Sequence, residues 1–250
     1  MILYHYFKME MFENFFKTNI LSLTQICQWN KDEDSQKEGA AFNWDFTRIR
    51  NYYSLPDEIS QNMLYGLKRA YYAQCWTVRP HDIKMWEKFS PDRDGVCVSI
   101  DSNVIYECMK KSLSARYEIF DLREVMYIPQ MGVSSAIFDD NTDFSRFAEC
   151  FVDKSTEFEY EKEYRYIAYK KNIISEFGNM IIQHSESGQP WNLFDLIKIR
   201  KLTNENVKYI YYEIPFSSVV EVIVDPRMSA DDYDKLALLC ANHRISCKYQ

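Results

Sequence analysis

Glycine is scarce in this chain, and its scarcity excludes a common class of nucleotide site. Only 6 of the 250 residues are glycine, and neither a GxGxxG motif nor a Walker-type loop occurs. Such loops depend on glycine because its backbone approaches phosphate closely and adopts positive φ angles. The sequence therefore argues against a glycine-rich phosphate cradle.

Cysteine and histidine lack the spacing of a metal site. The seven cysteines form no CxxC pair and lie mainly in apolar segments such as Val96-Cys97-Val98, while the four histidines are scattered. A zinc site needs paired Cys or His residues at short spacing. We therefore predict reduced, buried thiols and no metal site of this kind.

Signals for membranes and for export are also missing. No apolar run of 18 residues occurs, and the first residues lack a basic segment followed by a long apolar stretch. The net charge of -7 argues against broad, sequence-independent binding of nucleic acid, although a nucleic acid held briefly as a substrate stays open. We expect a cytoplasmic protein with no membrane partner.

The chain is rich in aromatic and apolar residues, with 19 Tyr, 16 Phe and 46% hydrophobic content, which suffices for one full core over residues 1–250. Short alternating and helical periodicities intermingle along it. The expected strands are 2–6, 20–23, 71–77, 96–100, 117–119, 125–128, 164–169, 207–214, 219–224 and 245–249. The expected helices are 9–17, 57–70, 82–89, 103–113, 143–154 and 230–242. Residues 172–206 have weak periodicity and are interpreted as an insertion or lid.

The segment from Lys154 to Arg165 carries four carboxylates at the entrance of an apolar strand. In extended geometry side chains repeat every two residues, so Glu161, Glu163 and Arg165 would share one face. That face could line a cleft. The same residues could equally form a solvated surface stretch or a buried ion network.

A set of short segments spans nearly the whole chain: Leu3-Tyr4-His5-Tyr6, Cys75-Trp76-Thr77, Met85-Trp86, Gly95-Val96-Cys97, Val125-Met126-Tyr127, Lys154, Tyr160 to Arg165, Val222-Ile223-Val224 and Pro226-Arg227. Together these segments resemble a bacterial family called domain of unknown function 2971. Lys88-Phe89 and Asp225 depart from residues often found in that family.

The opening also resembles the first element of ADP-ribosyltransferase-like folds, in which a strand bearing His leads through a short helix to a strand ending near Leu21-Ser22. This resemblance implies a single α+β domain with a central twisted mixed sheet. It also implies NAD as substrate, with Glu163 as the catalytic carboxylate and Glu161 as its auxiliary. The implied NAD-binding residues are His5, Tyr6, Trp76, Thr77, Trp86, Lys154 and Arg165.

The function implied is that of an NAD-dependent ADP-ribosyltransferase or NAD glycohydrolase, serving as a bacterial toxin or anti-phage effector. The acceptor would be protein, nucleic acid or water, and a regulatory protein partner is conceivable. Breaking the bond between nicotinamide and ribose builds positive charge on the sugar, which a carboxylate can stabilise. Two alternatives stay open: a non-catalytic module that binds a nucleotide or a protein, and a nuclease whose carboxylates hold Mg²⁺.

Overall fold

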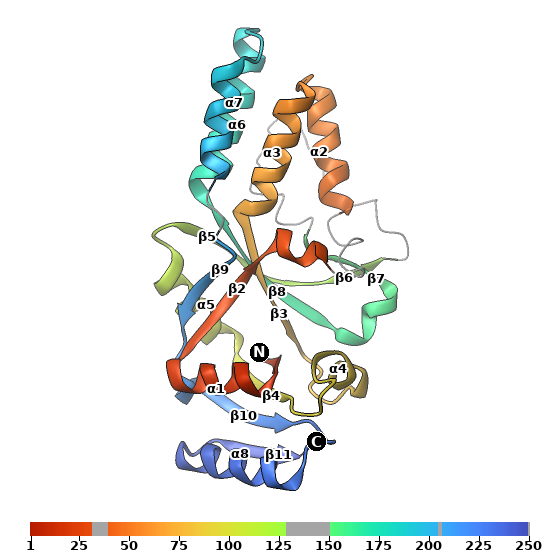
Figure 1. Cartoon of the computed structure of the whole chain (residues 1–250), viewed down its shortest axis with the longest axis vertical. Coiled ribbons are helices and arrows are strands. Elements are labelled where there is room, and N and C mark those ends of the chain that lie inside the picture. Colours follow the sequence, from red (N-terminus) through yellow and green to blue (C-terminus); the bar gives the residue numbers. More distant parts are fainter. Residues whose placement is uncertain (32–39, 129–150, 205–206, 250) are drawn as a thin grey trace.

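A computed structural model describes the chain except for residues 32–39, 129–150, 205–206 and 250 (Figure 1). It is an α+β structure with a large mixed sheet, as the sequence predicts. The strands are β1 (Ile2–Phe7), β2 (Ile20–Gln25), β3 (Tyr71–Thr77), β4 (Val96–Asp101), β5 (Tyr117–Glu124), β6 (Met126–Ile128), β7 (Asp153–Ser155), β8 (Glu163–Lys170), β9 (Tyr209–Glu213), β10 (Val219–Val224) and β11 (Ser246–Tyr249). The helices are α1 (Met9–Thr18), α2 (Ala40–Tyr52), α3 (Asp57–Ala70), α4 (Ile83–Phe89), α5 (Ser102–Leu113), α6 (Lys171–Ser187), α7 (Leu193–Thr203) and α8 (Ala230–Asn242).

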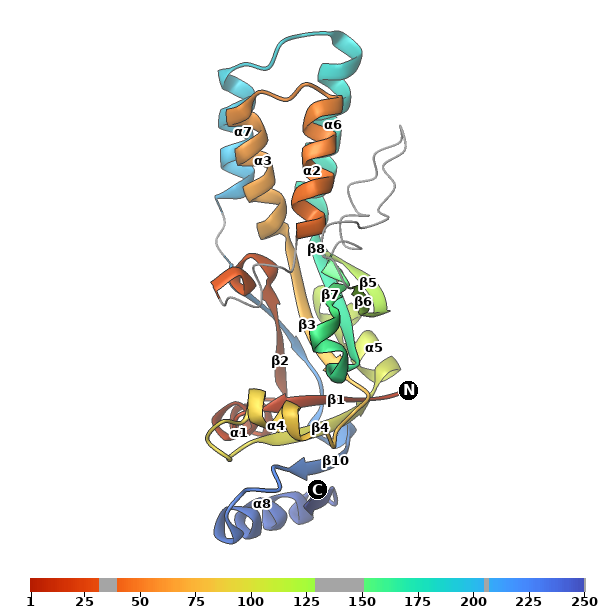
Figure 2. The same ribbon diagram turned by 90° about the vertical axis from the view of Figure 1, so that its right-hand side faces the viewer.

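Strand β3 organises the sheet. One of its edges pairs with β8 along the whole strand, from Tyr71 opposite Tyr169 to Thr77 opposite Glu163. The other edge is shared: β1 pairs at the Thr77 end, whereas β2 pairs nearer the start of β3. The two strands therefore diverge and leave a fork that α1 bridges, and Figure 2 shows β1 turning away from β2. Strands β4, β10 and β11 continue the sheet beyond β1, and β9 continues it beyond β2.

Local sequence signals account for the helix that closes the fork. Phe12 and Phe15 recur at helical spacing on α1 and are fully buried. Asn19 ends the helix in the left-handed conformation with φ 58°, as expected from its position, since Asn tolerates that region better than most residues. Its side-chain Oδ1 accepts a hydrogen bond from the backbone N–H of Phe216 at 2.8 Å. The turn between α1 and β2 is thus held by the helix end at Asn19 and by the hydrogen bond from Phe216.

A group of helices projects from one end of the sheet (Figures 1 and 2). Helices α2, α3, α6 and α7 share an apolar core with the near end of β3 and β8, including Met63, Phe177 and Ile199. Of residues 172–206, interpreted from sequence as an insertion or lid, residues 172–204 lie in this projection and supply most of α6 and all of α7, whereas 205–206 lie outside the described residues. Their role as a lid stays a prediction.

Two expectations about the carboxylate-rich segment are wrong. Residues 143–150 of the expected helix 143–154 lie outside the described residues, and Lys154 lies on strand β7 rather than at a helix end. Residues Thr156–Glu161 form a 3-10 helix, so Glu161 precedes the strand. Lys162 then adopts the left-handed conformation with φ 42°, and extended structure begins only at Glu163. Glu163 and Arg165 alone keep the predicted shared face.

Gly66 provides a test of the helical packing. A Cβ atom at this position of α3 would collide with Thr203 Cγ2 of α7 and would lie 3.0 Å from Phe177 of α6. We expect Gly66→Ala to destabilise the protein by about 1–3 kcal/mol, because overpacking outweighs the gain of about 1 kcal/mol in helix propensity. Urea unfolding measures the change. Adding Thr203→Ser removes the colliding methyl group and should restore much of the stability; a Gly66→Ala variant more stable than the parent would contradict this packing.

Candidate functional site

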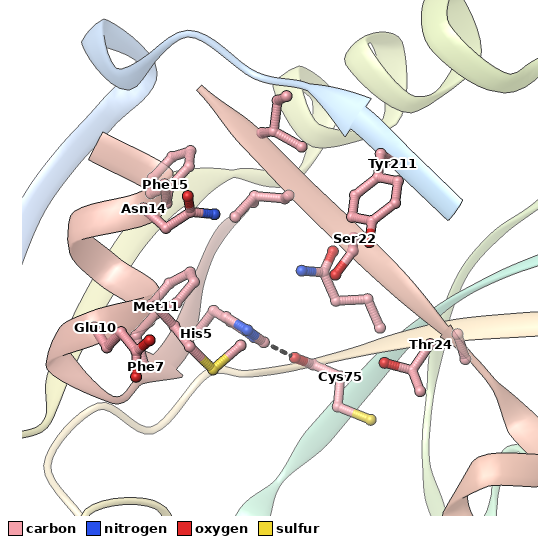
Figure 3. A pocket seen from close by; sticks show the side chains of 14 residues that line it. His5, Phe7, Glu10, Met11, Asn14, Phe15, Ser22, Thr24, Cys75 and Tyr211 are labelled. Atoms are coloured by element: carbon pink, nitrogen blue, oxygen red, sulfur yellow. Dashed lines mark hydrogen bonds between the residues drawn. The ribbon is translucent and has the colours of Figure 1, made fainter. Parts of the chain in front are cut away.

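A cleft of about 530 Å³ occupies the fork between β1 and β2 (Figure 3). Helix α1 forms one wall, β2 and β9 form the opposite wall, and the middle of β3 lies between them. Side chains of mixed character line it: His5, Phe7, Glu10, Met11, Asn14, Phe15, Ile20, Leu21, Ser22, Thr24, Ala73, Gln74, Cys75 and Tyr211. A concave site with several hydroxyl and amide groups among apolar ones is typical of small-molecule binding.

His5 is oriented at the base of the cleft. Its Nδ1 lies 2.8 Å from the backbone oxygen of Cys75 on β3, so Nδ1 carries the proton and Nε2 is left as an acceptor. Its ring contacts Phe7 and Trp76, with centroids 4.5 and 5.1 Å away. Burial lowers the pKa of His5 to about 4, against the smaller opposing effect of the Cys75 carbonyl. The imidazole is therefore neutral at neutral pH.

The same histidine also borders a second, smaller cavity of about 60 Å³. Its lining includes most of the site residues expected from the sequence: His5, Tyr6, Trp76, Thr77, Glu161 and Glu163, together with Tyr4, Cys75, Met85 and Phe89. His5 and Cys75 are common to the cleft and the cavity. The fold thus brings together residues far apart in the sequence, with His5 and Glu163 in one cavity.

Glu161 and Glu163 belong to a buried ion network behind that cavity. Lys154 Nζ lies 2.7 Å from Glu161 Oε2 and 3.0 Å from Glu163 Oε2. Arg165 binds both oxygens of Glu163, with Nε 2.6 Å from Oε1 and Nη2 3.1 Å from Oε2. Lys88 of α4 lies 2.9 Å from Glu161 Oε1 and is the most exposed of the five, at 30%. Among the described residues, three cations therefore face these two carboxylates.

The network holds Glu163 in its charged form. Burial by itself would raise the pKa of Glu163, but the charges of Arg165 and Lys154 and the hydrogen bond from Arg165 outweigh it and place the pKa well below its usual range. Arg165 also donates from Nη1 to the Phe151 carbonyl at 2.5 Å. Lys154 and Arg165, expected to hold a pyrophosphate, thus lie against carboxylates and line neither the cleft nor the cavity.

The remaining predicted residues have structural contacts of their own. The Thr77 hydroxyl donates to the Glu161 carbonyl at 2.5 Å, and the Tyr6 hydroxyl donates to the Pro80 carbonyl at 2.9 Å. Trp86 is completely buried beneath Tyr6, with ring centroids 4.6 Å apart, and borders neither space. Trp76 is also buried, but it lines the cavity. Trp86 is therefore a core residue in this structure.

Several lining residues of the cleft were missed from the sequence. Ser22 and Thr24 alternate on β2, with Tyr211 of β9 directly opposite Ser22. The alternation of these residues is typical of a strand. Long-range pairing decides which strand flanks β2 and which face of β2 stays open. Glu10, Asn14 and Gln74 carried no signal of a site. Among the described residues, no group of three or more His, Cys, Asp or Glu is placed to hold a metal ion.

From the ion network we predict that the stability of the fold depends strongly on Lys154. Lys154→Met keeps the length of the side chain but removes a positive charge that offsets those of Glu161 and Glu163. We therefore expect the free energy of unfolding to fall by about 3–5 kcal/mol near neutral pH. The stability that comes from a carboxyl with a lowered pKa is present above its unfolded pKa of about 4.3 and is lost as the pH falls further. The difference in free energy of unfolding between Lys154→Met and the parent should therefore be smaller at about pH 3.5 than at neutral pH.

Urea unfolding at both pH values makes this measurement, and Lys162→Met is the matched control. Within the described part of the chain, Lys162 forms a salt bridge with the exposed Glu159 of the same segment at 2.7 Å, and its Nζ lies 5.8 Å from the centroid of the Tyr127 ring. Its replacement should leave the unfolding curve unchanged, because exposed pairs contribute little. Equal curves for Lys154→Met and the parent at neutral pH would show that the network does not stabilise the fold.

Comparison with known proteins bears on the network more than on the cleft. Residues 85–166 match the model of a family described as "Protein of unknown function (DUF2971)". This range contains Trp86, Lys88, the two buried carboxylates and their cations, but none of the residues that line the cleft. No curated protein and no solved structure matches the chain. No described helix is long and apolar enough to cross a membrane. Over residues 85–166 the chain is thus similar to the DUF2971 family, as the sequence motifs indicate.

Proposed function

We propose that this protein binds NAD in the cleft between β1 and β2 and breaks the bond between nicotinamide and ribose, as an ADP-ribosyltransferase or NAD glycohydrolase. The observation that supports this most is the position of His5. It borders the cleft and shares the small cavity with Glu163, the two residues that the resemblance to ADP-ribosyltransferase-like folds assigns to one site. The strand, helix and strand that open the chain also frame this cleft.

The sizes of the two spaces assign them different roles in this proposal. The cleft, at about 530 Å³, falls in the range of small-ligand sites, whereas the cavity of about 60 Å³ has room for only a few water molecules. The dinucleotide would lie in the cleft. His5, neutral and with Nε2 as an acceptor, would receive a hydrogen bond from a ribose hydroxyl or from the carboxamide of nicotinamide.

The chemistry requires stabilisation of a cation. When the bond from the ribose anomeric carbon to nicotinamide breaks, its electron pair goes to the ring nitrogen, which becomes neutral, and positive charge appears on the ribose. Water or an acceptor group then bonds to the anomeric carbon and releases a proton. In the role expected from the sequence, Glu163 would face this charge, with Glu161 beside it.

A second function is favoured by one specific observation: Glu161 and Glu163 are both bound by cations. Among the described residues, Lys88, Lys154 and Arg165 offset the charges of both carboxylates, which lessens the stabilisation these could give to a developing cation nearby. A module that binds a nucleotide without cleaving it needs no free carboxylate there. Such a module would bind NAD but release no nicotinamide. The toxin or anti-phage role implied by resemblance stays a prediction.

NAD binding is expected to require His5. His5→Ala removes the hydrogen-bonding group at the base of the cleft and should weaken binding by about tenfold, the equivalent of about 1.4 kcal/mol. Because its pKa is about 4, His5 stays neutral from weakly acidic to weakly alkaline pH, and binding should not change over this range. Titration calorimetry measures both. His81→Ala, an exposed histidine outside the cleft, is the control, and unchanged affinity in His5→Ala would overturn the assignment of the site.

Glu163→Gln separates the two candidate functions. If Glu163 faces the developing charge, the amide should lower nicotinamide release by about 10²-fold to 10³-fold at temperatures where the variant stays folded. Melting curves should also shift downward, because Arg165 and Lys154 lose a charged partner. Glu159→Gln, on the exposed side of the segment, is the control. Nicotinamide release equal to that of the parent would remove Glu163 from catalysis, and NAD binding without any release in the parent would favour the non-catalytic module.

A further inference from the structure

Glu10 is the one charged residue among the described residues that line the cleft. It lies in the first turn of α1 and is exposed to solvent. Within the described part of the chain, no salt bridge pairs its carboxylate with a cation. Its neighbour on the same helix, Glu13, is bound by Lys17 at 3.1 Å, and Glu163 is bound by two cations. The cleft therefore offers a carboxylate that is not neutralised by a salt bridge.

The surroundings of Glu10 are aromatic and uncharged. Phe7 and Phe15 lie parallel to each other with centroids 5.8 Å apart, and both line the cleft at the α1 end. Met11 of the same helix adds a thioether, and His5 is neutral. Figure 3 shows Glu10, Met11, Phe7 and His5 gathered at this end, with Tyr211 on the far side beyond Ser22. Phe7 and Phe15 are almost fully buried, at 4% and 1% exposure, so the α1 end combines one negative charge with an uncharged wall and the thioether of Met11.

This combination selects one class of ligand. A cation is attracted by a carboxylate that no lining cation offsets, and a methionine sulfur contacts the edges of a flat aromatic ring favourably. An anionic group would meet Glu10 and no lining cation. We propose that the α1 end of the cleft binds an aromatic cation of the pyridinium class, with Glu10 as its counter-charge.

The inference deepens the proposed function and rests on it for the identity of the natural ligand, because the nicotinamide ring of oxidised NAD is a pyridinium. It orients the dinucleotide: the ring lies against α1, the ribose reaches the polar groups of β2 and β3, and the phosphates lie away from Glu10. Glu10 then faces the bond that breaks. The charge that leaves the ring passes to the ribose beside the same carboxylate.

A simpler role for Glu10 leaves a different signature. An acidic residue in the first turn stabilises a helix through the helix dipole, so Glu10→Gln could lower the melting temperature without any ligand being involved. If Glu10 had that role alone, Glu10→Gln would affect the binding of a cationic ligand and of a neutral ligand equally. The test therefore compares two ligands of nearly the same shape and different charge.

The experiment titrates the parent protein with the N-methylnicotinamide cation and with neutral nicotinamide at low salt, using calorimetry. We expect the parent to bind the cation about 5-fold more tightly, as for one exposed ion pair. Glu10→Gln should lose this preference while keeping its affinity for nicotinamide. Glu13→Gln, on the same helix and outside the cleft lining, should retain the preference.

Titration with NAD, run alongside, separates this inference from the proposed function. A cation preference that depends on Glu10, in a protein that does not bind NAD, supports the pyridinium site and overturns NAD as the ligand. NAD binding with no cation preference, or with a preference that survives in Glu10→Gln, overturns the pyridinium site alone. Absence of binding by the parent to both small ligands at millimolar concentration overturns it as well.

Discussion

The divided edge of β3 is the constraint on which the rest of the structure depends. One edge of β3 is fully occupied by β8, and the other is given at one end to β1 and at the other to β2. A strand whose edge is shared in this way forces its two neighbours apart, and the groups of β3 between them face an opening rather than a third strand. The cleft, its wall formed by α1, and the hydrogen bond from His5 to the Cys75 carbonyl all follow from this pairing.

The carboxylates of Glu161 and Glu163 differ from that of Glu10 in their electrostatic surroundings. Glu161 and Glu163 are removed from water and are bound by Lys88, Lys154 and Arg165, whose charges offset those of the two carboxylates. Within the described part of the chain Glu10 has no salt bridge, so its charge is screened by water but is not offset by a cation. A site that must stabilise positive charge needs the second kind of carboxylate or a rearrangement of the first. Whether cations bind a carboxylate therefore affects how well that carboxylate can stabilise positive charge in the mechanism.

Sequence patterns predicted the local structure of the sheet well and its long-range arrangement poorly. Tyr71–Thr77 and Val219–Val224 were predicted with their observed bounds, because each is an apolar run with clear ends. Helix α2 was not predicted, and α6 and α7 were not recognised as helices, since α7 has apolar residues on its exposed side too, such as Phe194 at 82% exposure. His5, Glu161 and Glu163 were placed in one site by resemblance alone, and in the structure all three line one cavity. The ion pairs of Lys154 could not be predicted, because they join three elements whose packing no local pattern encodes.

The network and the cleft are physically connected through β3, although the family match covers only the network. Arg165 lies opposite Cys75 in the pairing of β8 with β3, and the Cys75 carbonyl holds Nδ1 of His5. Ion pairs that fix β8 against β7 therefore also fix the strand that orients His5 in the cleft. A buried network of this kind can matter for binding without touching a ligand, since its geometry sets where the neutral imidazole points. The shared cavity of Glu163 and His5 is then consistent with mechanical support of the cleft by the network.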